Sequence, residues 1–198
     1  MVNKVKVCLD LDDVLTGFMK GFSDFHNNNH GTSISYDNIK TLNIAKLLGI
    51  SQDEAWGIVE SYYNSADFDS LIPYDGVIRV LEEFTSLGID LVIVTYRSGT
   101  GWKKSHDWLK KHFGSHIKLV HGLDKNGMRL NKGKVCAEQG VSFILEDCLD
   151  NAIHCLEEGI TPFVLTMPWN IDRELPSGVV RVKDHQEFFQ KVSSLIKK

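Results

Sequence analysis

The stretch "VCLDLDDVLTGF", residues 7–18, decides how this chain is interpreted. An apolar run ends there in three acids, Asp10, Asp12 and Asp13. Alternation along an extended backbone puts Asp10 and Asp12 on the same side of the chain. Two such carboxylates repel each other unless a positive charge, such as a hard divalent cation, offsets them. In the alternative interpretation, Asp12 or Asp13 caps a helix and the other acids are solvated.

The composition is that of a weakly acidic globular protein. The chain has 198 residues, of which 42% are hydrophobic and 24% charged, with a formal net charge of −4. That length suffices for a core without disulfides or structural metals. No block of basic residues occurs, so we expect neither duplex nucleic acid nor a membrane as partner. An apolar strand directly follows the start and no Cys-x-x-Cys pair occurs, so we expect no signal peptide and a cytoplasmic protein with reduced cysteines. The oligomeric state is left open.

Continuous apolar runs predict a parallel sheet. Strands buried on both faces have this pattern, whereas half-exposed strands alternate. The predicted strands are Lys4–Leu9, Asp90–Thr95, Ile117–Val120, Val141–Leu145, Pro162–Thr166 and Val179–Val182. The predicted helices between and after them are Asp75–Leu87, Trp102–Phe113, a short one ending near Gln139, Asn151–Glu158 and Gln186–Ile196. This order predicts the α/β class with a doubly wound, Rossmann-like parallel sheet, whose ligands bind at the carboxyl ends of the strands.

A long insert separates the first two strands. Roughly sixty residues intervene, where a crossover needs about a dozen or a little more. Three segments between Thr16 and about Phe68 have helical spacing, and Ser51 with Glu54 forms a capping box for the third. We therefore expect a catalytic core of residues 1–16 and 74–198, with residues 17–73 as a small helical cap over the site.

Other strand ends also carry polar side chains. Thr95 ends the second strand, and its hydroxyl and nearby backbone amides could hold phosphate oxygens, with Arg97 and Ser98 as further donors. A β-branched strand end followed by a glycine-rich turn would explain the same residues. Glu146 and Asp147 end the fourth strand, and a helix cap would explain one acid of the pair at most.

Lysines complete the set. "LNKGKVCAEQG" places Lys132 and Lys134 at the start of the helix before the fourth strand, where a solvated surface role is also open. Each signal is weak by itself. An acid pair, a hydroxyl, a lysine and a second acid cluster, in order at one edge of a sheet, together indicate a phosphoryl-transfer site.

With these motifs the sequence resembles the haloacid dehalogenase (HAD) superfamily of phosphohydrolases. "CLDLDDVLTGF" is similar to its first motif, Thr95 to its second, Lys132 or Lys134 to its third, and "ILEDCLDNA" to its fourth. "VTYRSG", the "PWN" at 168–170 and the placement of the insert further resemble the 5′(3′)-deoxyribonucleotidase branch.

The resemblance implies a role for each residue. Asp10 would be the nucleophile, forming an aspartyl-phosphate, and Asp12 the general acid and base. Mg²⁺ would be held by Asp10, Asp12 and the acid pair, with Asp147 or Glu146 as the direct ligand. The phosphate would be held by Thr95, Tyr96, Arg97 and a lysine, Lys132 being preferred to Lys134 by its spacing to "VC".

The expected function is thus a Mg²⁺-dependent phosphomonoester hydrolase acting on (deoxy)nucleoside monophosphates. Alternatives are a phosphatase of the same family for a sugar phosphate or a nucleic-acid 3′ phosphate, and a non-enzymatic phospho-receiver or nucleotide-binding module. Asp13 departs from the family, which often has glycine there, although Asp tolerates unusual backbone angles. Aromatic residues of the insert could stack a base or form its core: Phe18, Phe22, Trp56, Tyr62 and Tyr63.

Overall fold

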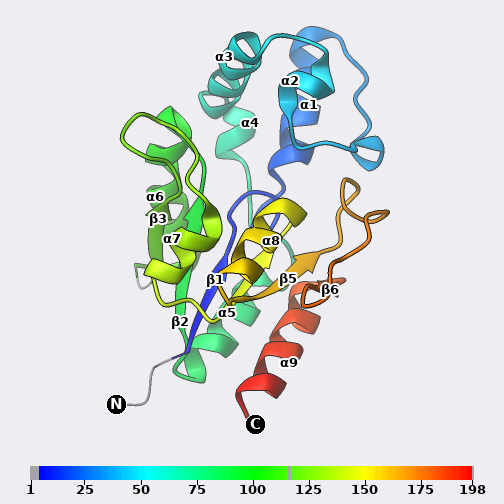
Figure 1. The fold of residues 1–198 in the computed structure, drawn as a ribbon. Coiled ribbons are helices and arrows are strands. Elements are labelled where there is room, and N and C mark those ends of the chain that lie inside the picture. Colours follow the sequence, from blue (N-terminus) through cyan, green and yellow to red (C-terminus); the bar gives the residue numbers. More distant parts are fainter. Residues whose placement is uncertain (1–4, 116, 198) are drawn as a thin grey trace.

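A parallel sheet of six strands, in the order β3-β2-β1-β4-β5-β6, forms the centre of the computed structural model, which describes residues 5–115 and 117–197 (Figure 1). The strands span Lys6–Leu9 (β1), Asp90–Thr95 (β2), Lys118–His121 (β3), Phe143–Glu146 (β4), Thr161–Leu165 (β5) and Val180–Val182 (β6). The predicted α/β class with a doubly wound parallel sheet is confirmed. Lys4, the predicted start of the first strand, lies outside the described residues.

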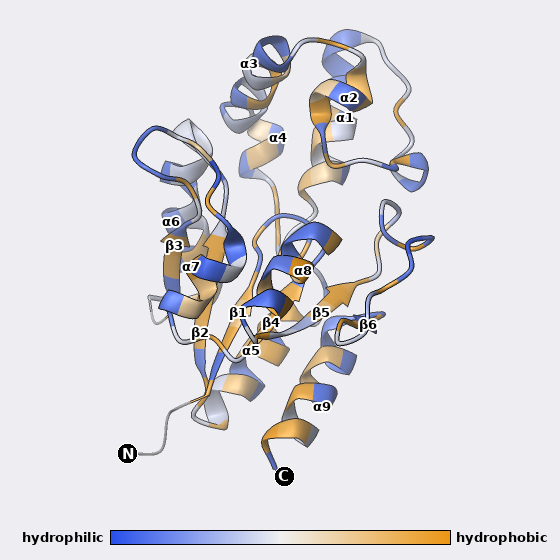
Figure 2. Ribbon diagram, viewed as in Figure 1, coloured by the Kyte–Doolittle hydropathy of each residue, from blue (hydrophilic) through white to orange (hydrophobic). Residues whose placement is uncertain are grey.

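The central strands are apolar on both faces because helices cover both (Figure 2). In β1, Val7, Cys8 and Leu9 are fully buried. Leu9 lies opposite Ile93 of β2 on one side and Leu145 of β4 on the other. The three strands are parallel and end within two residues of one another, so the polar residues at and after their ends meet at one edge of the sheet.

Two groups of helices cover the sheet. One face packs on α7 (Lys132–Glu138) and α8 (Leu149–Glu157), the other on α5 (Val77–Ser86), α6 (Gly99–Phe113) and α9 (His185–Ile196). On the second face Phe188 of α9 packs edge-on against both Phe84 and Phe163, at ring-centroid distances of 5.6 and 5.1 Å. Within the described residues, none of the helices is long and apolar enough to cross a membrane.

The segment predicted to be mostly helical from Thr16 to Phe68 is interrupted. Its helices are α1 (Phe18–His30), the 3₁₀ turn η1 (Tyr36–Asn38), α2 (Ile44–Leu48), α3 (Gln52–Tyr63) and α4 (Ala66–Asp69). Gly31 ends α1 in the left-handed region, with φ 65°. The side chain of Asn27 then holds the irregular stretch that follows, donating to the carbonyl of Ile34 at 2.9 Å and accepting from its N–H at 2.7 Å. Local polar bonds thus replace helix here.

A narrow connection joins α1–α4 to the rest of the chain. The outgoing backbone at Thr16 pairs with the returning backbone at Pro73. The Thr16 hydroxyl donates to the carbonyl of Ile72 at 2.9 Å, and Tyr74 N–H donates to the carbonyl of Leu15 at 2.9 Å. The chain leaves the rest of the protein and returns to it at this one point. We therefore propose that residues 17–73 form a separate unit, here called the cap, on a core of residues 5–16 and 74–197.

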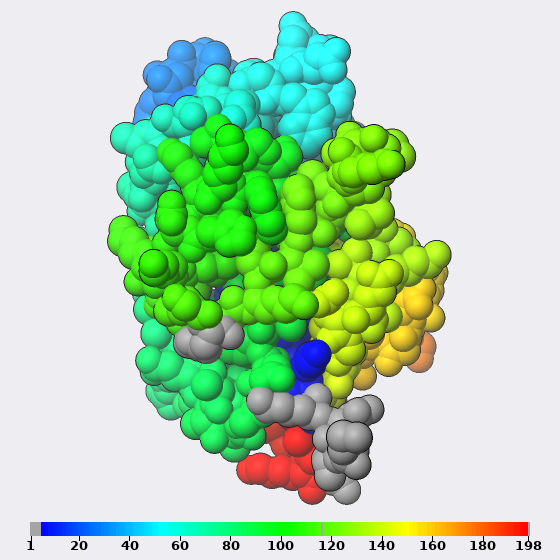
Figure 3. Space-filling model, turned by 90° about the vertical axis from the view of Figure 1, so that its left-hand side faces the viewer, coloured from blue at the N-terminus to red at the C-terminus, as the bar shows by residue number. Residues whose placement is uncertain are grey.

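The cap lies over the carboxyl ends of the strands (Figure 1) and packs directly on the core on the face that Figure 3 shows. It contacts the core on two sides. On one side Lys104 of α6 pairs with Asp69 at 2.6 Å, and the Trp108 indole N–H donates to the carbonyl of Leu71 at 2.7 Å. On the other side Lys40 pairs with Asp172 at 2.9 Å. The α6 helix also begins at Gly99 rather than at the predicted Trp102. A cap carboxylate, that of Glu60, accepts the Thr100 N–H at 3.2 Å and so satisfies this helix start.

Helices α7 and α8 approach closely because Gly133 has no side chain. A Cβ built there would lie 2.0 Å from the carbonyl oxygen of His154 in α8. Gly57, by contrast, lies inside α3 with open space around it. The two glycines separate the cost of a steric clash from the general effect of a helical glycine.

We expect Gly133→Ala to lower the free energy of unfolding by about 1–3 kcal/mol, because α7 must move away from α8. Gly57→Ala should instead raise it by roughly 0.5–1 kcal/mol, since alanine favours helix. Urea denaturation followed by circular dichroism measures both. Equal stability of the Gly133→Ala variant and the wild type would contradict the close packing.

Candidate functional site

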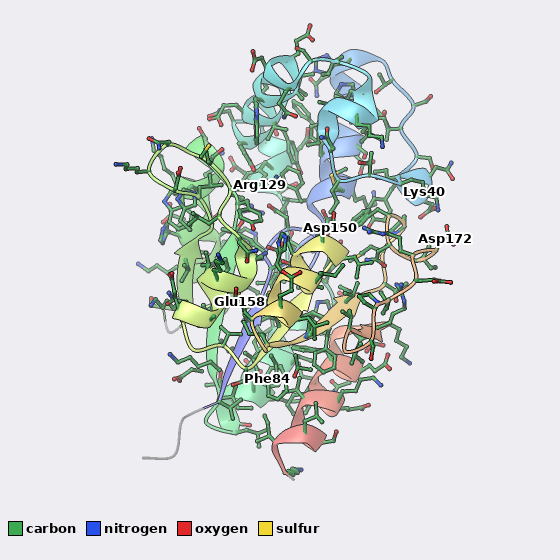
Figure 4. All side chains as sticks on the ribbon, in the orientation of Figure 1. Lys40, Phe84, Arg129, Asp150, Glu158 and Asp172 are labelled. Atoms are coloured by element: carbon green, nitrogen blue, oxygen red, sulfur yellow. The ribbon has the colours of Figure 1, made fainter. Side chains whose placement is uncertain are left out.

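A cavity of about 740 Å³ lies between the cap and the carboxyl edge of the sheet. Residues that follow β1, β2 and β4 line its floor, and residues of α1, α2 and α3 line its roof. Figure 4 shows Arg129 and Asp150 of the core at this level, with Lys40 of the cap beside Asp172 at the opposite side. Of the five acids at the ends of β1 and β4, four line the cavity: Asp10, Asp12, Asp13 and Asp147. Glu146 does not line it.

Asp10 directly follows β1 and contacts a buried lysine. The Lys132 ammonium donates to the Asp10 carboxylate and forms an ion pair with Glu146, the last residue of β4. Lys132 and Glu146 are completely buried, whereas the Asp10 side chain is 11% exposed and faces the cavity. Burial raises the pKa of Asp10 to about 7, and repulsion from Glu146 adds to the rise. The positive charge of Lys132 acts in the opposite direction and lowers this pKa, but it does not offset the rise. Burial alone would lower the pKa of Lys132, but the two carboxylates outweigh it and raise the pKa.

Asp12 has a different environment, two residues further on. Its carboxylate accepts from Arg97 Nε at 2.9 and 3.1 Å and from Arg97 Nη2 at 2.5 Å. Its side chain is 25% exposed, more than that of Asp10. The two acids of the first motif are therefore held by separate cations, Asp10 by a lysine and Asp12 by an arginine.

Asp13, the third acid of the opening stretch, has a structural role. Among the described residues it is the non-glycine residue with a positive φ, 58°, in the region that Asp tolerates better than most residues. Its carboxylate accepts the N–H of Met19 in the first turn of α1 at 3.0 and 3.1 Å. Asp13 is thus a buried helix cap that starts the cap unit. Burial, followed by repulsion from Asp12, raises its pKa well above the usual value.

Asp147 follows β4 and is fixed through its backbone. Its carbonyl oxygen accepts from Asn170 Nδ2 at 2.8 Å and from the Trp169 indole N–H at 3.2 Å. Asn170 Nδ2 also donates to the carbonyl of Leu165, at the end of β5. The "PWN" segment therefore ties the end of β5 to the turn after β4, and this leaves the Asp147 carboxylate facing the cavity.

Thr95 and Tyr96 line the cavity after β2. The Thr95 hydroxyl accepts the N–H of Arg97 at 3.2 Å, and its own proton has no acceptor among the described residues. The Tyr96 hydroxyl donates to the carbonyl of Leu130 at 2.8 Å. The centroid of the Tyr96 ring lies 5.3 Å from Lys132 Nζ, so the ring helps to shield the ammonium group from water.

Negative charge exceeds positive charge at this edge. Lys132 pairs with Asp10 and Glu146, and Arg97 pairs with Asp12. In the described part of the chain neither Asp13 nor Asp147 has an ion-pair partner. Burial, and then repulsion from Glu146 and Asp10, raises the pKa of Asp147 well above the usual value. The site therefore has room for a further positive charge beside Asp10 and Asp147.

This donor set fits Mg²⁺. Residues 5–115 and 117–197 contain no group of three or more His, Cys, Asp or Glu side chains arranged to hold a metal. Mg²⁺ does not require such a group, because it usually binds one or two carboxylates and completes its shell with water and phosphate oxygens. The residues that would hold it are Asp10, Asp147 and the backbone carbonyl of Asp12.

The aromatic residues of the insert divide into two groups. Phe22 and Tyr62 are fully buried and form the interior of the cap, as expected for aromatic residues with helical spacing. Phe18, Trp56 and Tyr63 line the cavity. Trp56 is 47% exposed, so a flat face of an aromatic side chain is open to a ligand.

The contacts of four predicted site residues bear on their assignments. Arg97 was expected to bind phosphate, but its guanidinium is engaged by Asp12, and the Tyr96 hydroxyl is engaged by Leu130. Glu146 was a candidate metal ligand, but it is completely buried against Lys132 and does not line the cavity. Lys134 is exposed on α7, and Lys132 takes the position beside Asp10.

Sequence reasoning missed the partner of Arg97. The pairing of Arg97 with Asp12 joins residues 85 positions apart, and no local sequence pattern indicates it. A helix-capping role for Asp13 was one of the alternatives that the sequence left open, because an Asp lies shortly before the start of a predicted helix, and the contact with Met19 supports it.

Comparison with known proteins places the chain in a family. The model of the family described as "5′ nucleotidase, deoxy (Pyrimidine), cytosolic type C protein" matches residues 3–193. A protein from Halalkalibacterium halodurans that is named as a nucleotidase is 26% identical over 183 residues, which cover 90% of this chain and 88% of that protein.

Solved structures with low identity share the fold. A HAD hydrolase of family IA, variant 3, from Entamoeba histolytica has a TM-score of 0.65 and 17% identity, covering 98% of this chain and 100% of that one. Protein Tyrosine Kinase A from Mycobacterium tuberculosis has a TM-score of 0.72 and 17% identity, with coverages of 96% and 99%. Because these two carry different names, the fold does not decide the activity, and the family match does. The chain belongs to the 5′ nucleotidase, deoxy (pyrimidine), cytosolic type C family of HAD-superfamily phosphohydrolases.

Proposed function

We propose that this phosphatase hydrolyses (deoxy)nucleoside monophosphates through an aspartyl-phosphate on Asp10, with Mg²⁺ bound. The observation that carries the proposal is the contrast between Asp10 and Asp12. Asp10 lies on the cavity floor against a buried lysine, and Asp12 lies nearer the solvent against an arginine. Two carboxylates in different environments can take different chemical roles.

In the first step the Asp10 carboxylate attacks phosphorus, and the bond from phosphorus to the ester oxygen breaks. Asp12, once protonated, gives its proton to the departing oxygen. In the second step Asp12 takes a proton from water as that water attacks phosphorus, which releases inorganic phosphate and restores Asp10. The balance is one water consumed for each ester bond broken.

The surrounding residues hold the charge that this reaction moves. Lys132 keeps Asp10 oriented and offsets charge on the phosphoryl oxygens, and the Thr95 hydroxyl is free to donate to one of them. When bound at Asp10, Asp147 and the Asp12 carbonyl, Mg²⁺ supplies positive charge to the phosphoryl group. The buried pair of Lys132 and Glu146 fixes the lysine from behind.

Cavity size, aromatic lining and family membership support a nucleoside as the leaving group. The cavity volume of about 740 Å³ lies within the range of sites for drug-sized ligands. Trp56 and Phe18 supply aromatic faces from the roof, opposite the acids of the floor. The family match supports the same class of substrate.

We expect Asp10→Asn to lower the turnover of p-nitrophenyl phosphate by about 10⁴-fold or more, because the amide cannot act as the nucleophile. Asp24→Asn on the exposed surface of α1 is the control and should keep wild-type turnover. Steady-state assays at saturating Mg²⁺ test both, with circular dichroism to check the fold. A turnover for Asp10→Asn within tenfold of wild type would contradict the nucleophile assignment.

Removal of metal should stop activity, and Mg²⁺ should restore it. We expect Asp147→Asn to raise the Mg²⁺ concentration for half-maximal rate by at least about tenfold, as loss of a metal ligand requires. Glu146→Gln should change this concentration by less than about threefold but lower the melting temperature, because Lys132 loses a buried partner. The assignment of the metal ligand is wrong if Glu146→Gln shifts the Mg²⁺ requirement more than Asp147→Asn does.

Trp56→Ala tests whether the cavity binds the base of a nucleoside. With deoxythymidine 5′-monophosphate as substrate we expect KM to rise roughly tenfold through loss of base stacking. With 2-deoxyribose 5-phosphate, which has the same sugar and phosphate but no base, KM should stay unchanged. Faster hydrolysis of the sugar phosphate than of any nucleoside monophosphate by the wild-type enzyme would favour the sugar phosphatase alternative.

A further inference from the structure

We propose that Arg97 is a positioning residue for Asp12 and links the acid and base of the reaction to the cap. This inference rests on the role proposed above for Asp12. It replaces the expectation that Arg97 binds the phosphate of the substrate. Three features support it: the geometry of the ion pair, the other contacts of the guanidinium, and the origin of those contacts.

The ion pair fixes the Asp12 carboxylate in its plane. Oδ1 accepts from both Nε and Nη2 of Arg97, at 2.9 and 2.5 Å, whereas Oδ2 accepts only from Nε, at 3.1 Å. A planar guanidinium fork restricts rotation of the carboxylate more than a lysine ammonium can. Because Oδ2 has one bond to Arg97 and Oδ1 has two, Oδ2 is the oxygen with a lone pair left free, and we assign the proton transfer to it.

Arg97 is itself held on its remaining sides. Nη1 donates to the Ser105 hydroxyl at 3.2 Å, and that hydroxyl donates to the carbonyl of Gly101 at 2.7 Å, inside α6. The guanidinium carbon lies 4.9 Å from the ring centroid of Phe68 in α4 of the cap. The Arg97 side chain is 1% exposed. Arg97 lines the cavity, but each of its guanidinium nitrogens already has a partner inside the protein, and this suits a structural clamp better than a phosphate ligand.

The Phe68 contact brings the cap into this arrangement. Lys104 lies 5.9 Å from the same ring and pairs with Asp69, so α4 is held on α6 beside Arg97. The backbone of Arg97 is fixed as well, since its carbonyl accepts a hydrogen bond from His121 Nε2 at 2.8 Å. Docking of α4 therefore sets the position of the guanidinium, and the guanidinium sets that of Asp12.

The choice of leaving group separates positioning of the acid from binding of phosphate. A nucleoside alkoxide needs a proton as it leaves, whereas p-nitrophenolate leaves without one. The value of kcat/KM reports only the steps up to loss of the leaving group, so the later role of Asp12 as base does not enter. A phosphate ligand would matter equally for both substrates, because both carry the same phosphate.

We expect Arg97→Gln to lower kcat/KM for deoxythymidine 5′-monophosphate about 10²-fold and for p-nitrophenyl phosphate less than about threefold. Arg97→Lys, which keeps the charge but not the fork, should fall between Arg97→Gln and the wild type on the nucleotide. Arg79→Gln, an exposed arginine on α5 paired with Glu83, is the matched control and should leave both values unchanged.

A double-mutant cycle completes the test. In an Asp12→Asn background, Arg97→Gln should cost less than about threefold on the nucleotide, because its target is already lost. An equal loss on both substrates that persists in the Asp12→Asn background would overturn the proposal and make Arg97 a phosphate ligand. Full activity of Asp12→Asn alone would instead remove the proposed acid and base, which is a separate failure.

Phe68→Leu keeps the test valid if Arg97→Gln does not fold. Phe68 does not line the cavity; its ring contacts Arg97 and the rings of Tyr62 and Tyr63. An effect carried by Tyr63 on binding would change both substrates, whereas an effect carried by Arg97 on Asp12 changes the nucleotide alone. With a melting curve that shows a folded protein, we expect a lower kcat/KM for the nucleotide at an unchanged value for p-nitrophenyl phosphate. Unchanged values for both substrates would contradict the link between the cap and Asp12.

Discussion

A completely buried lysine between two carboxylates is the interaction on which this site depends. Lys132 joins Asp10, at the end of β1, to Glu146, at the end of β4, and so holds two adjacent strand ends together. A buried charge of this kind is stable only while it is paired, and removal of either partner leaves the other uncompensated. The same contact that stabilises the sheet edge therefore also fixes the proposed nucleophile.

Each of the three acids of the opening stretch has its own partner. Asp10 faces Lys132, Asp12 faces Arg97, and Asp13 accepts the Met19 N–H at the start of α1. One short loop thereby holds the nucleophile, the acid and base, and the entry to the cap. Like-charged side chains can be crowded in this way because each one has a different partner, a lysine, an arginine or the backbone N–H of a helix start.

Much of the fold followed from the sequence, because buried parallel strands have continuous apolar runs that glycines separate. The order of the elements, the strand ends with Asp10, Thr95 and Asp147, and the HAD resemblance were all accessible this way. The limits of the helices were less accessible. The cap segment after Gly31 is held by hydrogen bonds to the Asn27 side chain and is not helical, and α6 starts earlier than predicted because the Glu60 carboxylate accepts an N–H at its first turn. Both depend on contacts that local sequence patterns do not encode.

Within the site, residue types were predicted better than their partners. The sequence predicted a lysine, and the structure selects Lys132 over Lys134 because the first faces the strand ends and the second faces solvent. It could not reveal that Arg97 turns toward Asp12, nor that Glu146 turns away from the cavity toward Lys132. Such pairings join distant positions, and only tertiary packing brings them together.

The central claim is that a phosphoryl group is transiently bonded to the Asp10 carboxylate. Rapid mixing with substrate, an acid quench, borohydride reduction and peptide mass spectrometry measure it directly, because reduction converts an acyl phosphate to an alcohol. The account predicts homoserine at position 10, dependent on substrate and absent from unmixed enzyme. Reduction at another acid, or none during steady turnover under conditions that trap acyl phosphates, would contradict it.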